Sequence, residues 1–132
     1  LMNIQELSTI KQYRLPVKIF ILNNHYMGMV KQWQELLHGN RLSESYMESL
    51  PDFVKLAESF GANGIQVIKP SDVDDAIKEM LKIKGPVICD VVVDPDENCF
   101  PMIPSGSTHN QMLLGPNDKL EGEISEEGMV LV

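Results

Sequence analysis

Three apolar runs have the residue types and lengths of β-strands. Residues 17–22 (VKIFIL) form a near-continuous run rich in β-branched residues that ends at Asn23-Asn24, which predicts a strand buried on both faces, as in a parallel sheet. Residues 65–68 predict a second, short strand, and residues 86–93 (PVICDVVV) predict a third.

Helical spacing of apolar residues precedes the first strand and follows it. A stripe predicts a helix over the first dozen residues, made of Leu1, Ile4 and Leu7. Because no capping residue precedes this helix, we expect the chain to be a C-terminal piece of a longer protein, truncated at its N-terminal side. Residues 28–38 are predicted to be helical, and the polar residues 39–51 a loop.

Two further helices have recognisable ends. Asp52 is the predicted N-cap of a helix that continues to Phe60 and stops at Gly61. Ser71 is predicted to cap another helix, with Asp74 in the position of a capping box, and that helix ends over residues 82–85 before Pro86. Strands that alternate with helices predict an α/β fold with three layers, α/β/α, around a parallel sheet.

After residue 93 the pattern changes to proline, glycine and polar residues, so we expect a domain over 1–93 and a tail over 94–132. The tail carries eight of the 19 acidic residues and one of the 11 basic residues, while the net charge of the whole chain is −8. A balanced body and an acidic tail offer no basic patch, so we expect neither nucleic acid nor membrane as a partner.

The first residues lack the pattern of a signal peptide, and no apolar run approaches the length of a membrane span. Two cysteines, Cys89 and Cys99, are too few for a disulfide scaffold and are expected to be reduced, which predicts a cytoplasmic protein.

The end of the first strand carries the candidate chemistry. Asn23 and Asn24 offer neutral oxygen ligands at the carboxyl end of a predicted parallel strand, where ligands bind in such sheets, and they suit a hard cation such as Mg²⁺. Gly28 lets the backbone approach closely, so the amides after it can face a diphosphate. An ordinary asparagine-rich turn is the alternative interpretation of the same residues.

A longer stretch around these asparagines closely resembles acetohydroxyacid synthase (acetolactate synthase). Residues 23–36 (NNHYMGMVKQWQEL) are similar to the end of the thiamine-diphosphate motif of that family. The resemblance extends to residues 51–61 (PDFVKLAESFG), 85–87 (GPV) and 101–106 (PMIPSG). It implies the C-terminal, diphosphate-binding domain of a catalytic subunit with the thiamine-diphosphate-binding fold.

The resemblance also implies which residues bind cofactor and metal. It assigns Mg²⁺ to the side chain of Asn24 and the backbone oxygen of Tyr26, and places Met27, Gly28 and Met29 beside thiamine diphosphate. The Gly-Asp-Gly that opens the family motif, whose Asp is a further metal ligand, is absent from this sequence. The glutamate that activates the thiamine ring belongs to another domain, so no catalytic residue is assigned here.

Three residues are implied to line the substrate site. Val30 stands where pyruvate-decarboxylase-type relatives have a catalytic glutamate, and an apolar side chain there favours ligation over protonation. Trp33 is implied to favour 2-ketobutyrate as acceptor, and Ser105 is implied to line the same site. Ser105 belongs to the tail, whose residues 101–106 we expect to act as a lid. The alternatives are a helix-surface or core aromatic for Trp33, a turn residue for Ser105 and core packing for Met29.

The implied function is condensation of pyruvate with a second 2-ketoacid, with loss of CO₂, in branched-chain amino-acid biosynthesis. The family is expected to form a homodimer, to bind FAD in a domain outside this chain, and to pair in some cases with a regulatory subunit. Two alternatives remain: a related thiamine-diphosphate carboligase or oxidase, and a non-catalytic dimerisation or docking domain. The isolated chain is expected to be inactive.

Overall fold

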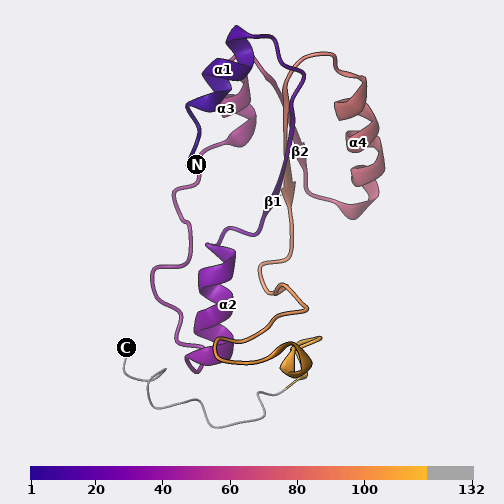
Figure 1. Ribbon diagram of the computed structural model, residues 1–132. Helices are drawn as coiled ribbons and strands as arrows, with labels where there is room; N and C mark the ends of the chain where they lie inside the picture. The colour runs from indigo at the N-terminus through magenta and orange to yellow at the C-terminus, as the bar shows by residue number, and fades with distance from the viewer. Residues whose placement is uncertain (119–132) are drawn as a thin grey trace. The chain divides into compact units, whose positions relative to one another are not determined.

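The structure, a computed structural model, describes residues 1–118. The chain divides into two compact units, one spanning Leu1–Asp96 and a second that begins at Glu97. Every named strand and α-helix of the described residues lies in the first unit (Figure 1). They run in the order α1 (Glu6–Gln12), β1 (Lys18–Asn23), α2 (Gly28–Leu37), α3 (Phe53–Ser59), β2 (Asn63–Val67), the 3₁₀ turn η1 (Pro70–Asp72), α4 (Val73–Lys82) and β3 (Val87–Val92).

The three strands form one parallel sheet in the order β1-β3-β2. The central strand β3 is almost wholly buried, and its Asp90 is aligned with Ile21 of β1 and with Gln66 of β2. All three strands therefore end at the same edge of the sheet, and β1 leads from there directly into α2. This edge holds the residues that the sequence singles out for chemistry.

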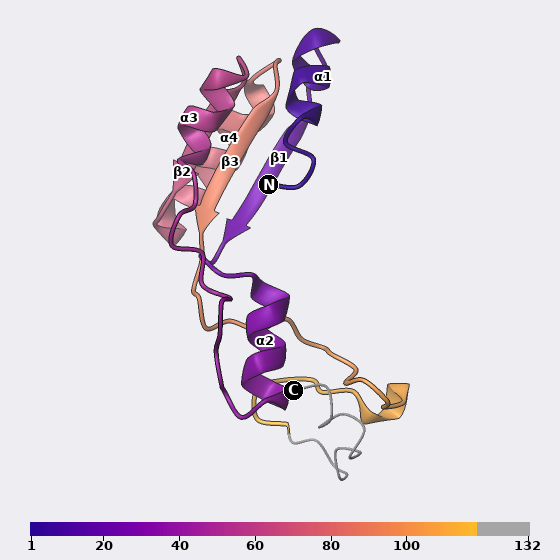
Figure 2. The ribbon, with the colours of Figure 1, turned by 90° about the vertical axis from the view of Figure 1, so that its left-hand side faces the viewer.

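Helices cover the sheet on both faces, which confirms the three-layer α/β fold (Figures 1 and 2). On one face α1 and α3 enclose a cluster of buried residues, namely Leu7, Phe53, Ala57 and Ile88. On the other face α4 encloses a second cluster, namely Val67, Ala76, Met80, Val87, Cys89 and Val91. Alternation along β3 divides its side chains between the two clusters.

Helix α3 begins and ends as its sequence predicts. The Asp52 carboxylate accepts hydrogen bonds from the backbone N–H groups of Val54 and Lys55, both at 3.0 Å, and these bonds with the nearby Lys55 ammonium lower the pKa of Asp52. Gly61 follows the helix with φ +68°, a left-handed conformation that glycine adopts at low cost.

The prediction that β1 is buried on both faces is wrong. Ile19 and Ile21 pack against the cluster under α1 and α3, whereas Phe20 and Leu22 on the opposite face are 40% and 67% exposed. β1 is an edge strand, and α4 packs against β2 and β3. An apolar run permits burial on both faces, but the presence of a covering layer depends on tertiary structure.

The first helix begins at Glu6 rather than at residue 1. The preceding residues form turns in which the N–H of Ile4 donates to the carbonyl of Leu1 at 3.2 Å. Asn3 has φ +69°, and a left-handed residue at this position interrupts the helix. The apolar spacing of the first residues therefore extends beyond the helix itself.

Ser71 does not cap α4, which contradicts the predicted capping box. It lies within η1, and its Oγ donates to the Asp72 carboxylate at 2.7 Å. Pro70 starts a 3₁₀ turn that continues directly into α4, so the backbone is already helical at Ser71. The helix α4 ends at Lys82, within the range 82–85 that the sequence predicts.

The strand β2 begins earlier than its apolar residues predict. It runs over Asn63–Val67, because Asn63 and Gly64 pair with Val87 and Ile88 of β3 although neither residue is apolar. The carboxyl end of α2 and the loop over 39–51 agree with prediction, since α2 ends at Leu37 and no helix or strand occupies the loop.

The second unit contains an isolated antiparallel bridge between Met102 and Leu113, whose N–H and carbonyl groups exchange hydrogen bonds of 2.8–2.9 Å. Between them lies the 3₁₀ turn η2 (His109–Gln111), for which Thr108 is the N-cap. The far end of the predicted acidic tail, residues 119–132, lies outside the described residues. The lid remains a prediction. Within residues 1–118 no helix has both the length and the apolar character to cross a bilayer.

Candidate functional site

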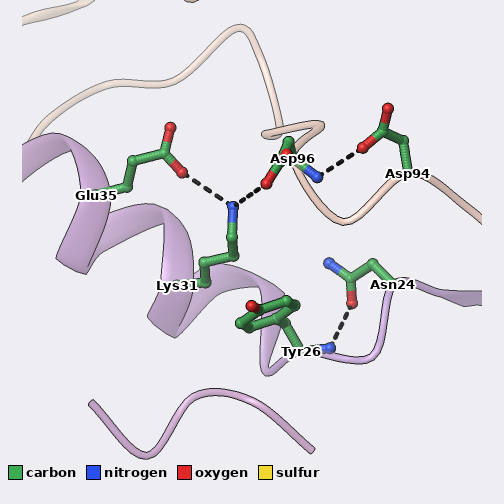
Figure 3. Close-up of polar contacts among 6 residues, drawn as sticks. All are labelled: Asn24, Tyr26, Lys31, Glu35, Asp94 and Asp96. Carbon is green, nitrogen blue, oxygen red and sulfur yellow. Dashed lines mark hydrogen bonds and ion pairs between the residues drawn. The ribbon is translucent and has the colours of Figure 1, made fainter. Parts of the chain in front are cut away.

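The turn between β1 and α2 (residues 23–28, hereafter the β1–α2 turn) is held by its own two asparagines. The Asn23 Oδ1 accepts from the backbone N–H of His25, and the Asn24 Oδ1 accepts from that of Tyr26, both at 3.1 Å (Figure 3 shows the second bond). His25 between them has φ +60°. Two successive Asx turns thus shape the connection between the end of the strand and α2, as the alternative interpretation of an ordinary asparagine-rich turn also predicts.

The loop over 39–51 supports this turn by backbone pairing. The N–H of Met27 donates to the carbonyl of Ser45, and the N–H of Met47 donates to the carbonyl of His25, both at 2.8 Å. The ring of Tyr26 meets the ring of Tyr46 edge to face, with centroids 5.2 Å apart. Because these backbone bonds are made by the neighbours of Tyr26, the pairing does not use the Tyr26 carbonyl oxygen.

Helix α2 starts without a side-chain cap. Its N-cap residue Met27 makes no capping hydrogen bond, and the first turn contains no acidic residue. A Cβ on Gly28 would lie 3.2 Å from the Asn24 Nδ2, so glycine leaves room for that amide against the start of the helix. The uncapped N–H groups and the helix dipole favour an anion at this position.

Lys31, one turn into α2, is 4% exposed and is already neutralised by two carboxylates (Figure 3). Its Nζ lies 3.1 Å from Glu35 and 3.3 Å from Asp96, and 5.4 Å from the centre of the Tyr26 ring. Burial alone would lower the pKa of Lys31, but the bonds to Glu35 and Asp96 outweigh it and the pKa is raised. Lys31 therefore supports the site structurally and is not a free cation for a phosphate.

The outward side of α2 is apolar although its buried positions are polar. In this helix Lys31 and Gln32 are buried, whereas the apolar side chains of Met29, Val30 and Trp33 are exposed. Residues spaced by three or four lie on one face of a helix, so these three side chains form one exposed surface. This inversion of the usual pattern is typical of a surface that binds a ligand or another part of a protein.

Two oxygens of the turn suit a hard cation. The Asn24 Oδ1 has a second lone pair beyond the one used by Tyr26 N–H, and the carbonyl of Tyr26 is left out of the pairing with the loop. Neither carries a charge, and no group of three or more His, Cys, Asp or Glu residues within 1–118 could hold a metal ion. The turn therefore fits as part of a Mg²⁺ site whose remaining ligands are phosphate oxygens, water and a carboxylate from elsewhere.

Comparison with known proteins identifies the family to which this arrangement belongs. The sequence model described as thiamine pyrophosphate enzyme, C-terminal TPP binding domain, matches residues 1–91, which include the β1–α2 turn and nearly the whole sheet. The chain is a member of this family of TPP-binding domains.

Among curated relatives, the domain is 49% identical to the acetolactate synthase large subunit of Haemophilus influenzae, over 86% of this chain and 20% of that protein. It is 46% identical to the acetolactate synthase isozyme 3 large subunit of Escherichia coli, over 89% of this chain and 21% of that protein. The chain thus spans about a fifth of the length of these relatives.

Among solved structures, the TPP-binding domain is similar to a thiamine diphosphate-dependent 4-hydroxybenzoylformate decarboxylase from Rhodococcus jostii RHA1. The TM-score is 0.64 and the identity 32%, over 72% of this chain and 18% of that one. The likeness agrees with the α/β fold assigned above.

The structure groups most of the predicted site residues. Those from the turn and the start of α2 are contiguous, namely Asn24, Tyr26, Met27, Gly28, Met29, Val30 and Trp33. Ser105 belongs to the second unit, where it is exposed in a turn closed by the N–H of Ser107 donating to Pro104 at 3.0 Å. Gly106 in this turn has φ +79°. A turn residue is the alternative that the sequence offers for Ser105, and its place in the substrate site remains a prediction.

Sequence reasoning missed several supporting residues of the TPP-binding domain. The lysine with its two carboxylates was one such group, and the buried Ser45 was another. A third was Asp90, a buried carboxylate in the central strand. Only Asp90 carried a signal, because an acidic residue interrupts an otherwise apolar strand at VICDVVV.

Proposed function

We propose that this chain is the C-terminal, diphosphate-binding part of an acetolactate synthase large subunit. The observation that carries the proposal is the β1–α2 turn, with two available oxygens followed by an uncapped helix, in a chain 46–49% identical to such subunits. The parent enzyme decarboxylates pyruvate and ligates it to a second 2-ketoacid in branched-chain amino-acid biosynthesis.

In this proposal the turn binds Mg²⁺ and the cofactor diphosphate. Asn24 donates its side-chain oxygen and Tyr26 its backbone oxygen to the metal. The N–H groups that begin α2 at Gly28 face the diphosphate, and Met27 and Met29 lie beside the cofactor. Thiamine diphosphate supplies the electron sink for decarboxylation when it is bound.

The exposed surface of α2 determines the fate of the substrate after decarboxylation. Val30 has no proton to give, so it does not quench the reacting carbon and leaves it available for a second ketoacid. Trp33 lies three residues further on the same face and shapes the space for the acceptor, pyruvate or 2-ketobutyrate. Ser105 contributes from the second unit, in a tail that closes over the substrate as a lid.

The remaining features of the parent belong to the same proposal. It is a cytoplasmic homodimer with FAD bound outside this chain, and it pairs in some cases with a regulatory subunit. We expect the 132-residue chain by itself to be inactive, because the Gly-Asp-Gly that opens the family motif is absent from it and the resemblance assigns the ring-activating glutamate to another domain.

Replacement of Asn24 in the full-length subunit tests the function. Asn24→Ala removes an oxygen ligand and is expected to abolish cofactor-dependent acetolactate formation at ordinary Mg²⁺ concentrations. Asn24→Asp keeps an oxygen for both the Tyr26 N–H and the metal, and should retain activity. Asn117→Ala, in an exposed turn of the second unit, is the control and should have no effect. Full activity of Asn24→Ala would place the metal elsewhere.

A related thiamine-diphosphate decarboxylase is the second candidate, favoured by the structural likeness to the 4-hydroxybenzoylformate decarboxylase. The two functions differ in their product. Pyruvate alone should yield acetolactate from a synthase, whereas a decarboxylase would release the aldehyde. Analysis of the product by mass spectrometry distinguishes them.

A further inference from the structure

Asp90 is a buried carboxylate that the metal and substrate sites described above do not use. It lies in the middle of the central strand β3 and is 2% exposed. None of the ion pairs found within residues 1–118 includes it. A buried carboxylate without a cation is costly, so its two oxygens need hydrogen-bond donors.

Amide groups from both neighbouring strands supply these donors. The Nδ2 of Asn23, at the end of β1, donates to Asp90 Oδ1 at 3.0 Å. The Nε2 of Gln66, on β2, donates to Asp90 Oδ2 at 3.1 Å. The three side chains therefore join all three strands close to the carboxyl edge of the sheet, where the β1–α2 turn begins at Asn23.

The orientation of Asn23 transmits this contact to the turn. Its Oδ1 accepts the N–H of His25 at 3.1 Å while its Nδ2 donates to Asp90. A rotation of the amide by half a turn would lose both bonds at once. Asn23 is buried, so water does not readily replace either partner. By accepting from the Nδ2, Asp90 thus fixes the amide orientation in which the Asn23 Oδ1 accepts from the N–H of His25. This bond supports the left-handed conformation of His25.

We propose that Asp90 is a positioning residue for the β1–α2 turn: by holding Asn23 it sets the backbone of His25, and with it the place of the Asn24 oxygen. The inference deepens the proposed function, because the ligands it positions are those assigned to Mg²⁺ and diphosphate. Asp90 acts through Asn23 and touches neither ligand.

An exchange of the two groups tests the direct coupling. Asn23→Asp alone faces Asp90 with a second carboxylate and should release the turn. Adding Asp90→Asn restores a donor and an acceptor in register, since Asp at 23 still accepts from His25 and Asn at 90 still accepts from Gln66. Gln66→Leu is the control, because it removes a donor to Asp90 that lies on β2 and makes no bond to the turn.

Two measurements separate this inference from the proposed function. In the 132-residue chain, amide hydrogen exchange at His25 should accelerate at least tenfold in Asn23→Asp. In the double variant its rate should return to within threefold of that of the unsubstituted chain. In the full-length subunit, the Kd for thiamine diphosphate with Mg²⁺ should rise about tenfold and recover in parallel, as for other residues that orient metal ligands.

The outcomes have distinct meanings. His25 exchange that is unchanged in Asn23→Asp, or that does not recover in the double variant, would overturn the positioning role whatever the cofactor does. If His25 exchange responds as expected while cofactor affinity does not change, the positioning role of Asp90 is supported. The placement of the diphosphate at the turn is then contradicted. If Asn23→Asp does not fold, recovery of the fold by Asp90→Asn still demonstrates the coupling, and its failure refutes it.

Discussion

At the scale of single residues, the turn depends on side chains that bond to the backbone next to them. Asn23 and Asn24 each accept an N–H two residues further along, which allows His25 to take a left-handed conformation that costs a residue with a side chain about 1–2 kcal/mol. The same short amides that weaken a strand therefore build the turn after it.

Trp33 is the residue for which the proposed function predicts a change in acceptor preference. Trp33→Leu in the full-length subunit should lower the preference for 2-ketobutyrate over pyruvate more than it lowers total turnover. One methylene in an apolar pocket is worth about 1–3 kcal/mol of discrimination. The measurement is the product ratio with both ketoacids present.

Tyr13→Leu provides a matched control for this variant. Tyr13 is an exposed aromatic residue at the end of α1. Replacing this aromatic side chain by leucine should therefore leave the product ratio unchanged. An unaltered ratio in Trp33→Leu would remove the specificity role from Trp33.

At the scale of elements, α3 packs on β2 at a distance that only glycine permits. A Cβ on Gly64 would lie 2.6 Å from the Cα of Val54 and 2.9 Å from its carbonyl oxygen. Both are backbone atoms, so the helix would have to move away from the sheet. The sequence shows Gly64 only as a residue before a short apolar run, and the close approach depends on where α3 lies.

Gly64→Ala is therefore expected to lower the free energy of unfolding by about 1–3 kcal/mol, as overpacking does elsewhere. Gly85→Ala is the control, because its Cβ would meet only the Asn63 Nδ2, at 3.8 Å, and its effect should stay within about 0.5 kcal/mol. Urea denaturation of the 132-residue chain measures both. Equal effects of the two substitutions would contradict the close packing of α3 on β2.

At the scale of the whole chain, the first unit presents an open strand edge beside an apolar surface. Val17 and Asn23 accept backbone hydrogen bonds from Val87 and Val93 at 3.0 Å. Backbone groups alternate in direction along a strand, so those of Lys18, Phe20 and Leu22 point away from β3. Within residues 1–118 no strand pairs with this edge of β1. An unpaired edge with exposed apolar side chains favours association with another chain.

A variant with both Phe20→Lys and Leu22→Lys should therefore reduce self-association of the 132-residue chain at high concentration. The paired change Ile68→Lys and Leu81→Lys is the control, since each of these residues is exposed but neither lies on β1. Sedimentation velocity over a range of concentrations measures the effect. Greater loss of association in the control pair would place the contact elsewhere.

Most elements could be predicted from the sequence, because periodicity and end signals are local. Asp52 and Gly61 mark the ends of α3 through contacts within a few residues, and the apolar run of β3 gives a buried strand. Predictions were wrong where a neighbouring element determines the structure. Ser71 is already part of η1 and so does not cap α4, and Phe20 is exposed because no helix of the described residues covers its face of β1. The asparagine turn could be predicted because its hydrogen bonds stay within two residues, while the binding roles of its residues remain predictions.

By itself the sequence determined the order of helices and strands, the asparagine turn and the family resemblance, because each depends on residues close together in the chain. Only the tertiary structure decided which face of β1 is covered, and which groups neutralise Lys31 and satisfy Asp90. Asp96 lies 65 residues after Lys31, and Asp90 lies 67 residues after Asn23. Such partners meet because a parallel sheet brings the ends of distant strands to one edge, and no local pattern encodes that meeting.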